Sequence, residues 1–222
     1  EKIGRKPRFV IGRDTRLSSS MLESAMAAGL CSVGCDVQML GVVPTPAVAY
    51  LVRKLEADAG IMLTASHLPF NRNGLKFFAK ESGLEADEVK EVLALAGDPY
   101  EAVPETARGN EKTESYMDKY AADLVKKVRD ACNEETPLKG KKIIVDAGGG
   151  AGGFYAEKVL VPLGADVAGS QYLTPDGYFK SHIPNPENET AMRSICEAVK
   201  REKADFGIIF DTDVDRAGAV DS

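Results

Sequence analysis

The stretch "KKIIVDAGGGAGG", Lys141 to Gly153, places a short apolar run directly before a glycine-rich turn. Its β-branched residues favour a strand, and the glycines that follow mark the end of that strand. The next segment, "FYAEKVLVPLG" at 154–164, is expected to form a helix. Strand, turn and helix in this order are the repeating pattern of α/β proteins. The stretch therefore predicts the start of an α/β unit.

The same alternation of strand-like and helix-like segments runs through the rest of the chain. Strands are expected at 7–12, 35–41, 59–64, 165–170, 204–211 and 217–222. Helices are expected at 18–34, 45–56, 85–97, 113–133 and 189–203. The predicted fold class is α/β, with two consecutive three-layer α/β/α domains and mixed, mainly parallel sheets.

A change in composition marks the expected domain boundary. The segment "EETPLKGKK", Glu134 to Lys142, is charged, holds a proline and a glycine, and has no hydrophobic periodicity. We expect one domain at 1–136 and a second at 137–222. The second would stop in the middle of a strand, and the sequence lacks an initiating methionine, so a fragment of a longer protein is expected.

Composition narrows the classes of protein to consider. The chain of 222 residues is 44% hydrophobic and 28% charged, has a net charge of −6, and contains no apolar run long enough for a bilayer. These features favour a soluble globular protein, and they disfavour nucleic acid or an anionic membrane as partner. The four cysteines lack zinc-like spacing and are expected to be reduced, which together with the absence of a signal peptide favours a cytoplasmic location.

The strongest chemical signal is "FDTDVDRAG", Phe210 to Gly218. Three aspartates spaced by two, Asp211, Asp213 and Asp215, would point to one side of an extended backbone. They would lie at the carboxyl end of an apolar strand, where α/β proteins usually place their sites. Carboxylates held this close repel one another, so they need a cation or must take up protons.

This stretch has three interpretations. An acidic turn is possible, although turns do not usually need three identical charges in phase with a strand. A calcium-binding EF-hand loop does not fit, because Arg216 stands where glycine is needed and Ser222 where glutamate is needed. A Mg²⁺ site fits better, since this ion accepts a few carboxylates and completes its shell with phosphate oxygens or water. Arg216 would then contact a phosphate.

A second polar stretch, "LTASHLPFNRNGLKFF" at Leu63 to Phe78, presents Ser66 and His67 together. No G-x-S-x-G frame surrounds the serine, so a hydrolase nucleophile elbow is not expected. A serine next to a histidine is more often structural than catalytic. The three aspartates favour a catalytic role for Ser66 over a structural one, because a phosphate on Ser66 would supply an anionic ligand at a magnesium site.

Several motifs together resemble the α-D-phosphohexomutase superfamily, which includes phosphoglucomutase, phosphomannomutase and phosphoglucosamine mutase. They occur in the family's order: "GRDTRLSS", "VPTPA", "TASHLPFNRNGLKFF", "VDAGGGAGG", "PDGYFKSHIPNPE" and "FDTDVDR". The resemblance implies the first two domains of a four-domain enzyme. It also implies interconversion of hexose 1-phosphate and hexose 6-phosphate through a phosphoserine and a hexose 1,6-bisphosphate, with Mg²⁺ as cofactor.

The resemblance also implies roles for individual residues. Ser66 matches the serine that carries the phosphoryl group. Lys76 matches the proposed general base or acid, and His67 and Arg216 match residues that line the phosphoryl site. The family's metal ligands correspond, together with the phosphate on Ser66, to Asp211, Asp213 and Asp215.

The chain departs from the family pattern at two positions and lacks some of its parts. Leu68 replaces the usual asparagine of the serine motif, and Thr212 replaces the usual glycine between the first two aspartates. Residues 1–222 are expected to contain neither the family's arginine-containing opening motif nor its third and fourth domains. Because those domains hold the substrate, these 222 residues alone are expected to be inactive.

Three features left alternatives open. In "GRDTR", Arg13, Asp14 and Arg16 could support the serine loop by ion pairing or cap the helix that follows. The run Gly148 to Gly153 satisfies G-x-G-x-x-G, so the chain could be a dinucleotide-binding module, although Asp166 does not stand where the expected acidic residue should. A third interpretation is a non-catalytic fragment that associates through exposed edges.

Overall fold

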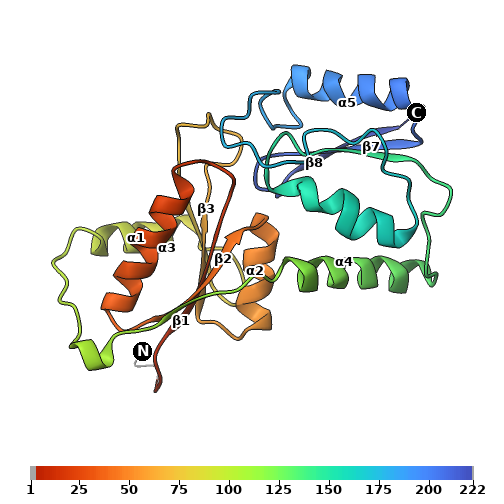
Figure 1. Ribbon diagram of the computed structural model, residues 1–222. Coiled ribbons are helices and arrows are strands. Elements are labelled where there is room, and N and C mark those ends of the chain that lie inside the picture. The colour runs from red at the N-terminus through yellow and green to blue at the C-terminus, as the bar shows by residue number, and fades with distance from the viewer. Residues whose placement is uncertain (1–3, 222) are drawn as a thin grey trace. The chain divides into compact units, whose positions relative to one another are not determined.

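The structure is a computed structural model in which residues 4–221 are described. The chain folds into two compact units, each with its own β-sheet (Figure 1). The first unit contains residues 4–13, 18–64 and 73–114. The second unit contains residues 14–17, 65–72 and 115–221, so two short loops from the first half of the chain belong to it.

A five-stranded sheet with the order β4-β3-β1-β2-β5 forms the centre of the first unit. Its strands are β1 (Arg8–Arg13), β2 (Asp36–Val42), β3 (Ala59–Leu63), β4 (Leu75–Phe78) and β5 (Glu111–Thr113). The central strand β1 pairs in parallel with β2 and β3, and β5 pairs in parallel with β2. Strand β4 runs antiparallel to β3, which makes this sheet mixed but mainly parallel.

Helices cover both faces of this sheet. Side chains of α1 (Ser19–Ser32) pack on a core that includes Ile11 and Ile61. On the other face, α2 (Thr45–Lys54) lies close to the backbone at Gly60, where an added Cβ would be 2.5 Å from a methyl group of Val52. The unit also contains α3 (Ala86–Leu95) and the short helix η1 (Glu105–Ala107).

A smaller sheet with the order β6-β7-β8 forms the centre of the second unit. The strands are β6 (Ile143–Asp146), β7 (Phe206–Phe210) and β8 (Ala217–Asp221), and β7 pairs in parallel with β6 and antiparallel with β8. The helical elements are α4 (Met117–Cys132), η2 (Ala151–Gly153), η3 (Ala156–Leu160), η4 (Val161–Leu163) and α5 (Glu189–Glu202). None of the helices within residues 4–221 has the length and apolar character needed to cross a bilayer.

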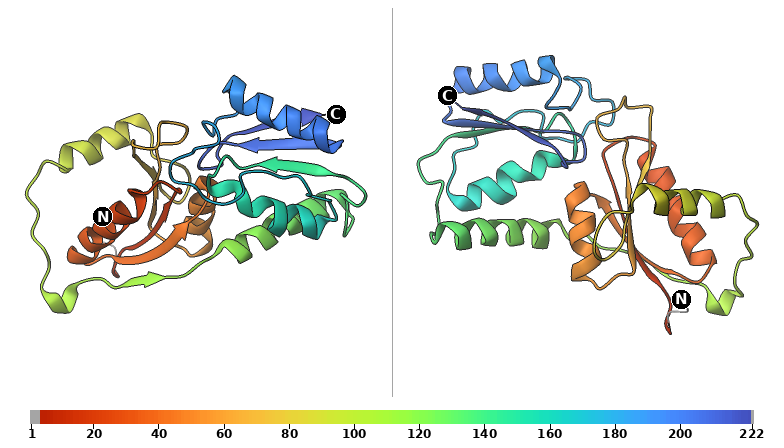
Figure 2. Two further views of the ribbon diagram at one scale, coloured as in Figure 1. Left: turned by 45° about the horizontal axis from the view of Figure 1, so that its top comes forward. Right: turned by 180° about the vertical axis from the view of Figure 1, so that it is seen from behind.

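The second unit is layered. Ile144 and Ile209 pack against α5 on one face of the sheet, and Val145 and Phe210 pack against η3 on the other. Beyond η3, α4 buries Val125 and its neighbours against the same helical segment. Figures 1 and 2 show this order of layers from three directions. Strands β6 and β7 therefore have helices on both of their faces, as strands buried in α/β units require, whereas the edge strand β8 exposes every second residue.

The predicted fold class is confirmed, with several local differences. The expected strand at 165–170 is absent; only isolated bridges at Asp166 and Gln171 reach the edge of β6. The expected helix at 154–164 contains a π-helical turn and then a 3₁₀ turn that holds Pro162, whose ring cannot continue regular helical bonding. The domain boundary after residue 136 stays a prediction; the longest segment of the second compact unit is 115–221, because α4 packs on the segment around η3.

Candidate active site

The three aspartates lie in a turn that follows β7. Asp211 and Asp213 are fully buried, and Asp215 is exposed. One carboxylate oxygen from each of the three lies within 4.8 Å of the others. The expectation of an extended backbone is wrong here: the Val214 amide donates to the Asp211 carbonyl at 3.3 Å, and Val214 has a φ of 62°. The turn, and not strand alternation, brings the carboxylates together.

Burial and mutual repulsion dominate the electrostatics of this aspartate loop (residues 211–216). Burial, followed by the neighbouring charge of Asp213, raises the pKa of Asp211 to about 7. The backbone amide of Arg216 donates to Asp211 at 3.1 Å and opposes this shift without cancelling it. The cluster therefore carries more negative charge than its surroundings compensate.

This cluster fits a divalent cation with a preference for oxygen ligands. The donors are carboxylate oxygens from one short loop, two of the three carboxylates are shielded from water, and the charge of Asp213 contributes to the raised pKa of Asp211, so a cation between them would relieve their repulsion. Magnesium is bound in proteins by one or a few carboxylates together with phosphate or water oxygens. The expected Mg²⁺ site is consistent with this arrangement.

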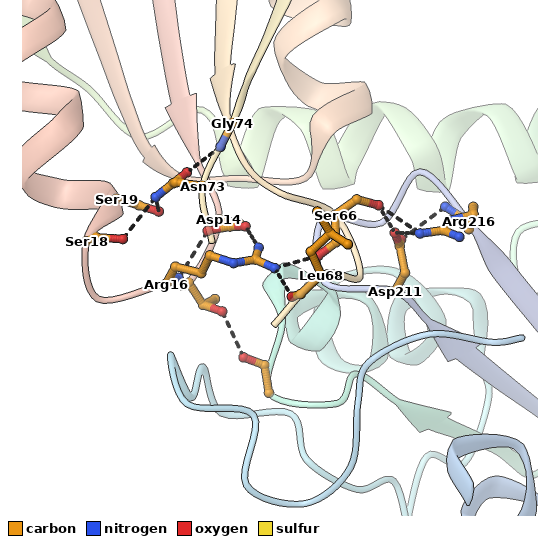
Figure 3. Close-up of polar contacts among 12 residues, drawn as sticks. Asp14, Arg16, Ser18, Ser19, Ser66, Leu68, Asn73, Gly74, Asp211 and Arg216 are labelled. Atoms are coloured by element: carbon orange, nitrogen blue, oxygen red, sulfur yellow. Dashed lines mark hydrogen bonds and ion pairs between the residues drawn. The ribbon is translucent and has the colours of Figure 1, made fainter. Parts of the chain in front are cut away.

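Ser66 lies directly beside the aspartate loop (Figure 3). Its Oγ donates to Oδ2 of Asp211 at 3.0 Å and accepts from Nη2 of Arg216 at 2.8 Å. The residue has a φ of 50°, a left-handed backbone that residues other than glycine seldom adopt. Such strain persists only where the surrounding structure holds it, and it is typical of functional sites.

Arg216 connects the serine loop (residues 65–72) to the aspartate loop. Besides Ser66, its guanidinium contacts Nδ1 of His67 and forms an ion pair with Asp211 at 3.3 Å. A longer ion pair at 3.8 Å joins it to Glu187, and about a third of the side chain, 31%, remains exposed. Arg216 can therefore contact both the serine oxygen and a charged group arriving from solvent.

The structure brings together six of the seven predicted site residues within the second unit: Ser66, His67, Asp211, Asp213, Asp215 and Arg216. The seventh, Lys76, belongs to the first unit, where it lies on β4 opposite Met62 of β3. Its role as proton donor or acceptor stays a prediction.

The glycine-rich loop (residues 148–153) packs against its neighbours at close range. A Cβ on Gly150 would lie 2.6 Å from the carbonyl oxygen of Thr212, and one on Gly153 would lie 1.8 Å from that of Leu173. The Ala151 amide also donates to the Thr212 carbonyl at 2.8 Å. These contacts give the glycines a packing role that supports the aspartate loop, and they do not favour the dinucleotide-binding alternative.

Sequence reasoning left Arg16 and Asp14 undecided and missed Phe179 altogether. Arg16 is fully buried, forms an ion pair with Asp14 and contacts the ring of Phe179. In contrast, Arg13 pairs at 2.8 Å with Glu23 of α1, in the first unit. The adjacency of charges in "GRDTR" was the only signal in the sequence, and it did not reveal which arginine is buried.

Two family models match the chain. Phosphoglucomutase/phosphomannomutase, alpha/beta/alpha domain I, matches residues 1–97, and domain II of the same family matches residues 114–222. Among relatives, a phosphoglucosamine mutase of Pelotomaculum thermopropionicum is 45% identical over 96% of this chain and 47% of its own length. A phosphoglucosamine mutase of Desulforamulus reducens is 41% identical over 98% of this chain and 48% of its own length.

Solved structures of the same family superpose on this chain. A phosphoglucomutase/phosphomannomutase family protein from Burkholderia thailandensis superposes with a TM-score of 0.83 at 27% identity, covering 97% of this chain and 46% of that one. A putative phosphomannomutase from Thermus thermophilus gives 0.78, also at 27% identity, covering 97% of this chain and 48% of that one. The chain thus spans about half the length of the relatives that it matches.

Proposed function

Because the chain belongs to the phosphoglucomutase/phosphomannomutase family, we propose that it supplies the phosphoryl-carrying half of a phosphohexomutase. In this reaction Ser66, as a phosphoserine, passes its phosphoryl group to a hexose monophosphate. The resulting bisphosphate turns over and returns its other phosphoryl group to Ser66. The net result is the interconversion of hexose 1-phosphate and hexose 6-phosphate.

One observation carries this proposal: the hydroxyl of Ser66 contacts both Asp211 and Arg216, at 3.0 and 2.8 Å. A serine that serves only the fold has no need for a buried carboxylate cluster and an arginine at its oxygen. Phosphoryl transfer would use both, because the arginine offsets part of the negative charge of a phosphoserine and the carboxylates would hold a cation that offsets the rest. The family membership of the chain supports the same assignment.

In the transfer step, a hydroxyl oxygen of the sugar attacks phosphorus, a new O–P bond forms, and the bond between phosphorus and Ser66 Oγ breaks. The hydroxyl proton goes to a base, for which Lys76 is the proposed residue. The electron pair of the broken bond stays on Ser66 Oγ, where Arg216 donates a hydrogen bond at 2.8 Å. In the return step the roles of the two oxygens are exchanged.

A bound Mg²⁺ would neutralise the charge on the transferring phosphoryl group. Asp211, Asp213 and Asp215 are the residues proposed to hold it, together with a phosphate oxygen on Ser66. Arg216 and His67 are proposed to line the phosphoryl site, since the two side chains contact each other beside Ser66. The partners implied are a hexose phosphate and a hexose 1,6-bisphosphate.

For the sugar, we propose a glucosamine phosphate. The two relatives above, at 45% and 41% identity, are both described as phosphoglucosamine mutases. A comparison of kcat/KM for glucosamine 6-phosphate, glucose 6-phosphate and mannose 6-phosphate tests this choice. A preference for mannose or glucose would overturn the choice of sugar without affecting the role of Ser66.

The test of the proposed function is mutase turnover in the natural polypeptide that carries residues 1–222. Ser66→Ala should abolish turnover, since it removes the phosphoryl carrier. Ser20→Ala, the same change at an exposed position of α1, should leave turnover intact. Normal activity in Ser66→Ala would refute the assignment.

A magnesium titration tests the metal site. Asp213→Asn removes one buried negative charge from the cluster and should raise the Mg²⁺ concentration for half-maximal activity by about tenfold or more. Asp98→Asn, at an exposed position after α3, is the matched control and should have no effect. The same titration curve for Asp213→Asn and wild type would place the metal elsewhere.

A further inference from the structure

Arg16 is a charged side chain in an unusual position. Only 1% of its surface is exposed to solvent, and it is the largest fully buried side chain among the described residues. Buried arginine is rare, because a guanidinium loses its hydration and must find paired acceptors. Its carboxylate partner, Asp14, is also completely buried, and both belong to the short segment 14–17 of the second unit.

The contacts of this guanidinium point to the serine loop (Figure 3). Nη1 pairs with Asp14, whereas Nη2 donates to the carbonyl of Ser66 at 2.8 Å and also to the carbonyl of Leu68. The two carbonyls flank the first turn of the loop, in which the Leu68 amide donates to the carbonyl of Ala65 at 3.0 Å. One planar group therefore fixes the backbone on both sides of His67.

Two further contacts hold the guanidinium itself. Its central carbon lies 5.2 Å from the centre of the Phe179 ring, a cation–π distance. Asp14 accepts the backbone amide of Arg16 at 3.0 Å as well as its side chain, so the carboxylate fixes both ends of the residue. Among the described residues, Arg16 Nε has no hydrogen-bond partner although it is buried. All the hydrogen bonds of the guanidinium described above are therefore made by Nη1 and Nη2.

We propose that Arg16 is a positioning residue for phosphoryl transfer: through the carbonyls of Ser66 and Leu68 it holds Ser66 in its left-handed backbone and so aims Oγ at Asp211 and Arg216. This inference rests on the proposed function of Ser66. The φ of 50° at Ser66 is unfavourable, and the clamp on its carbonyl supplies the constraint that maintains it. The charge of Arg16 is neutralised by Asp14, so Arg16 adds little to the attraction of a phosphate.

Because Arg16 orients Ser66 and does not bind the substrate, its loss should affect kcat and KM differently. Loss of an orienting contact lowers kcat, because a displacement of about 1 Å in a reacting group can cost about 100-fold in rate. Substrate affinity depends on other groups, so KM should change little. Lysine cannot replace Arg16, because a single ammonium group cannot reach Asp14 and both carbonyls in the geometry of the planar fork.

The experiment compares Arg16→Lys with Arg13→Lys, in the natural polypeptide that carries residues 1–222. Arg13 is the matched control because it belongs to the same motif but pairs with Glu23 in the first unit. Arg16→Lys should lower kcat about 100-fold with KM within about threefold of wild type. It should also speed amide hydrogen exchange of residues 65–72 by tenfold or so, while α5 exchanges as in wild type. Arg13→Lys should leave both readouts unchanged.

A second variant keeps the test decisive if Arg16→Lys does not fold. Phe179→Leu retains the arginine but removes the ring beneath it, and should give the same kcat pattern at a smaller size, about tenfold. Normal kcat in a folded Arg16→Lys, or unchanged exchange of residues 65–72, would overturn the proposal. If wild-type Ser66 takes up no phosphate, the proposed function fails, and the exchange measurement still reports on the clamp.

Discussion

Gly150→Ala would test the contact between the glycine-rich loop and the aspartate loop with a single added methyl group. Gly150 has a φ of −83°, which alanine also adopts, so the substitution introduces no backbone strain of its own. The new Cβ would lie 2.6 Å from the carbonyl oxygen of Thr212 and 2.9 Å from its Cα. Both atoms are backbone, so neither can rotate away, and the two loops must separate.

The magnitude follows from these contacts. Forcing a methyl group into a packed site typically costs about 1–3 kcal/mol. Separation would also lengthen the hydrogen bond from the Ala151 amide to the Thr212 carbonyl, now 2.8 Å, whose net contribution is about 1 kcal/mol. Alanine restricts the unfolded chain and recovers about 0.5 kcal/mol. We expect the free energy of unfolding of the second unit to fall by about 2 kcal/mol.

The assay is urea unfolding, followed by native-state hydrogen exchange of the β6 and β7 amides to assign the effect to the second unit. A loss of this size lowers the urea midpoint by about 1 M. The control is Gly29→Ala in the middle of α1, where an added Cβ meets nothing within 4 Å. This control should stabilise the first unit by about 0.5–1 kcal/mol, because alanine is the better helix former. Wild-type exchange of β7 in Gly150→Ala would show that the added methyl group fits without separating the two loops.

The remaining predictions concern the second unit. Burial alone lowers the pKa of His182, but the hydrogen bond and charge of Asp146 outweigh it and hold this pKa above its ordinary value. The contribution of the His182–Asp146 pair to the free energy of unfolding is therefore complete below about pH 6.5 and is lost as the pH rises through the folded-state pKa of His182. His182→Gln should remove that pH dependence in urea unfolding. An unchanged pH profile in this variant would contradict the pairing of His182 with Asp146. The Asn188 side chain accepts hydrogen bonds from the amides of Thr190 and Ala191 at the start of α5. Asn188→Ala should therefore lower the free energy of unfolding by about 1 kcal/mol and speed amide hydrogen exchange in the first turn of α5. Equal exchange in wild type and variant would argue against this cap. Ile209→Ala, at a fully buried position, should cost about 3 kcal/mol in thermal or urea unfolding, and more than Ile208→Ala on the half-buried side; the reverse order would be inconsistent with the described core.

The sequence predicted the buried parts of the fold better than its edges. Strands β1, β3 and β7 carry apolar runs bounded by turn residues, which is the pattern of a central strand. Strand β5 has the sequence Glu-Lys-Thr and is exposed throughout, so it carries no hydrophobic signal. Strand β4 has four residues and follows a polar loop, and its pairing with β3 depends on tertiary contacts that no local pattern records.

The site was predicted in part, for physical reasons that differ from residue to residue. The spacing of the aspartates indicated a shared cation, although a turn and not an extended strand brings them together. The contact between Ser66 and Asp211 joins positions 145 residues apart, so no local pattern predicts it; it was expected from the chemistry of a phosphate ligand at a magnesium site and from the family resemblance. The sequence left two roles open for Arg16, support of the serine loop or capping of the helix that follows, because an arginine in a loop is normally solvated and nothing in its neighbours shows that it is buried.

The proposed phosphoryl group on Ser66 is tested by the intact mass of the purified protein, followed by mapping of the peptide that contains Ser66. The protein is measured before and after incubation with glucose 1,6-bisphosphate and Mg²⁺, with Ser66→Ala treated in parallel. We expect one added phosphoryl group on Ser66 of the wild type and none in the variant. An unmodified Ser66 in the natural polypeptide under both conditions, or a phosphate found on another residue, would contradict this expectation.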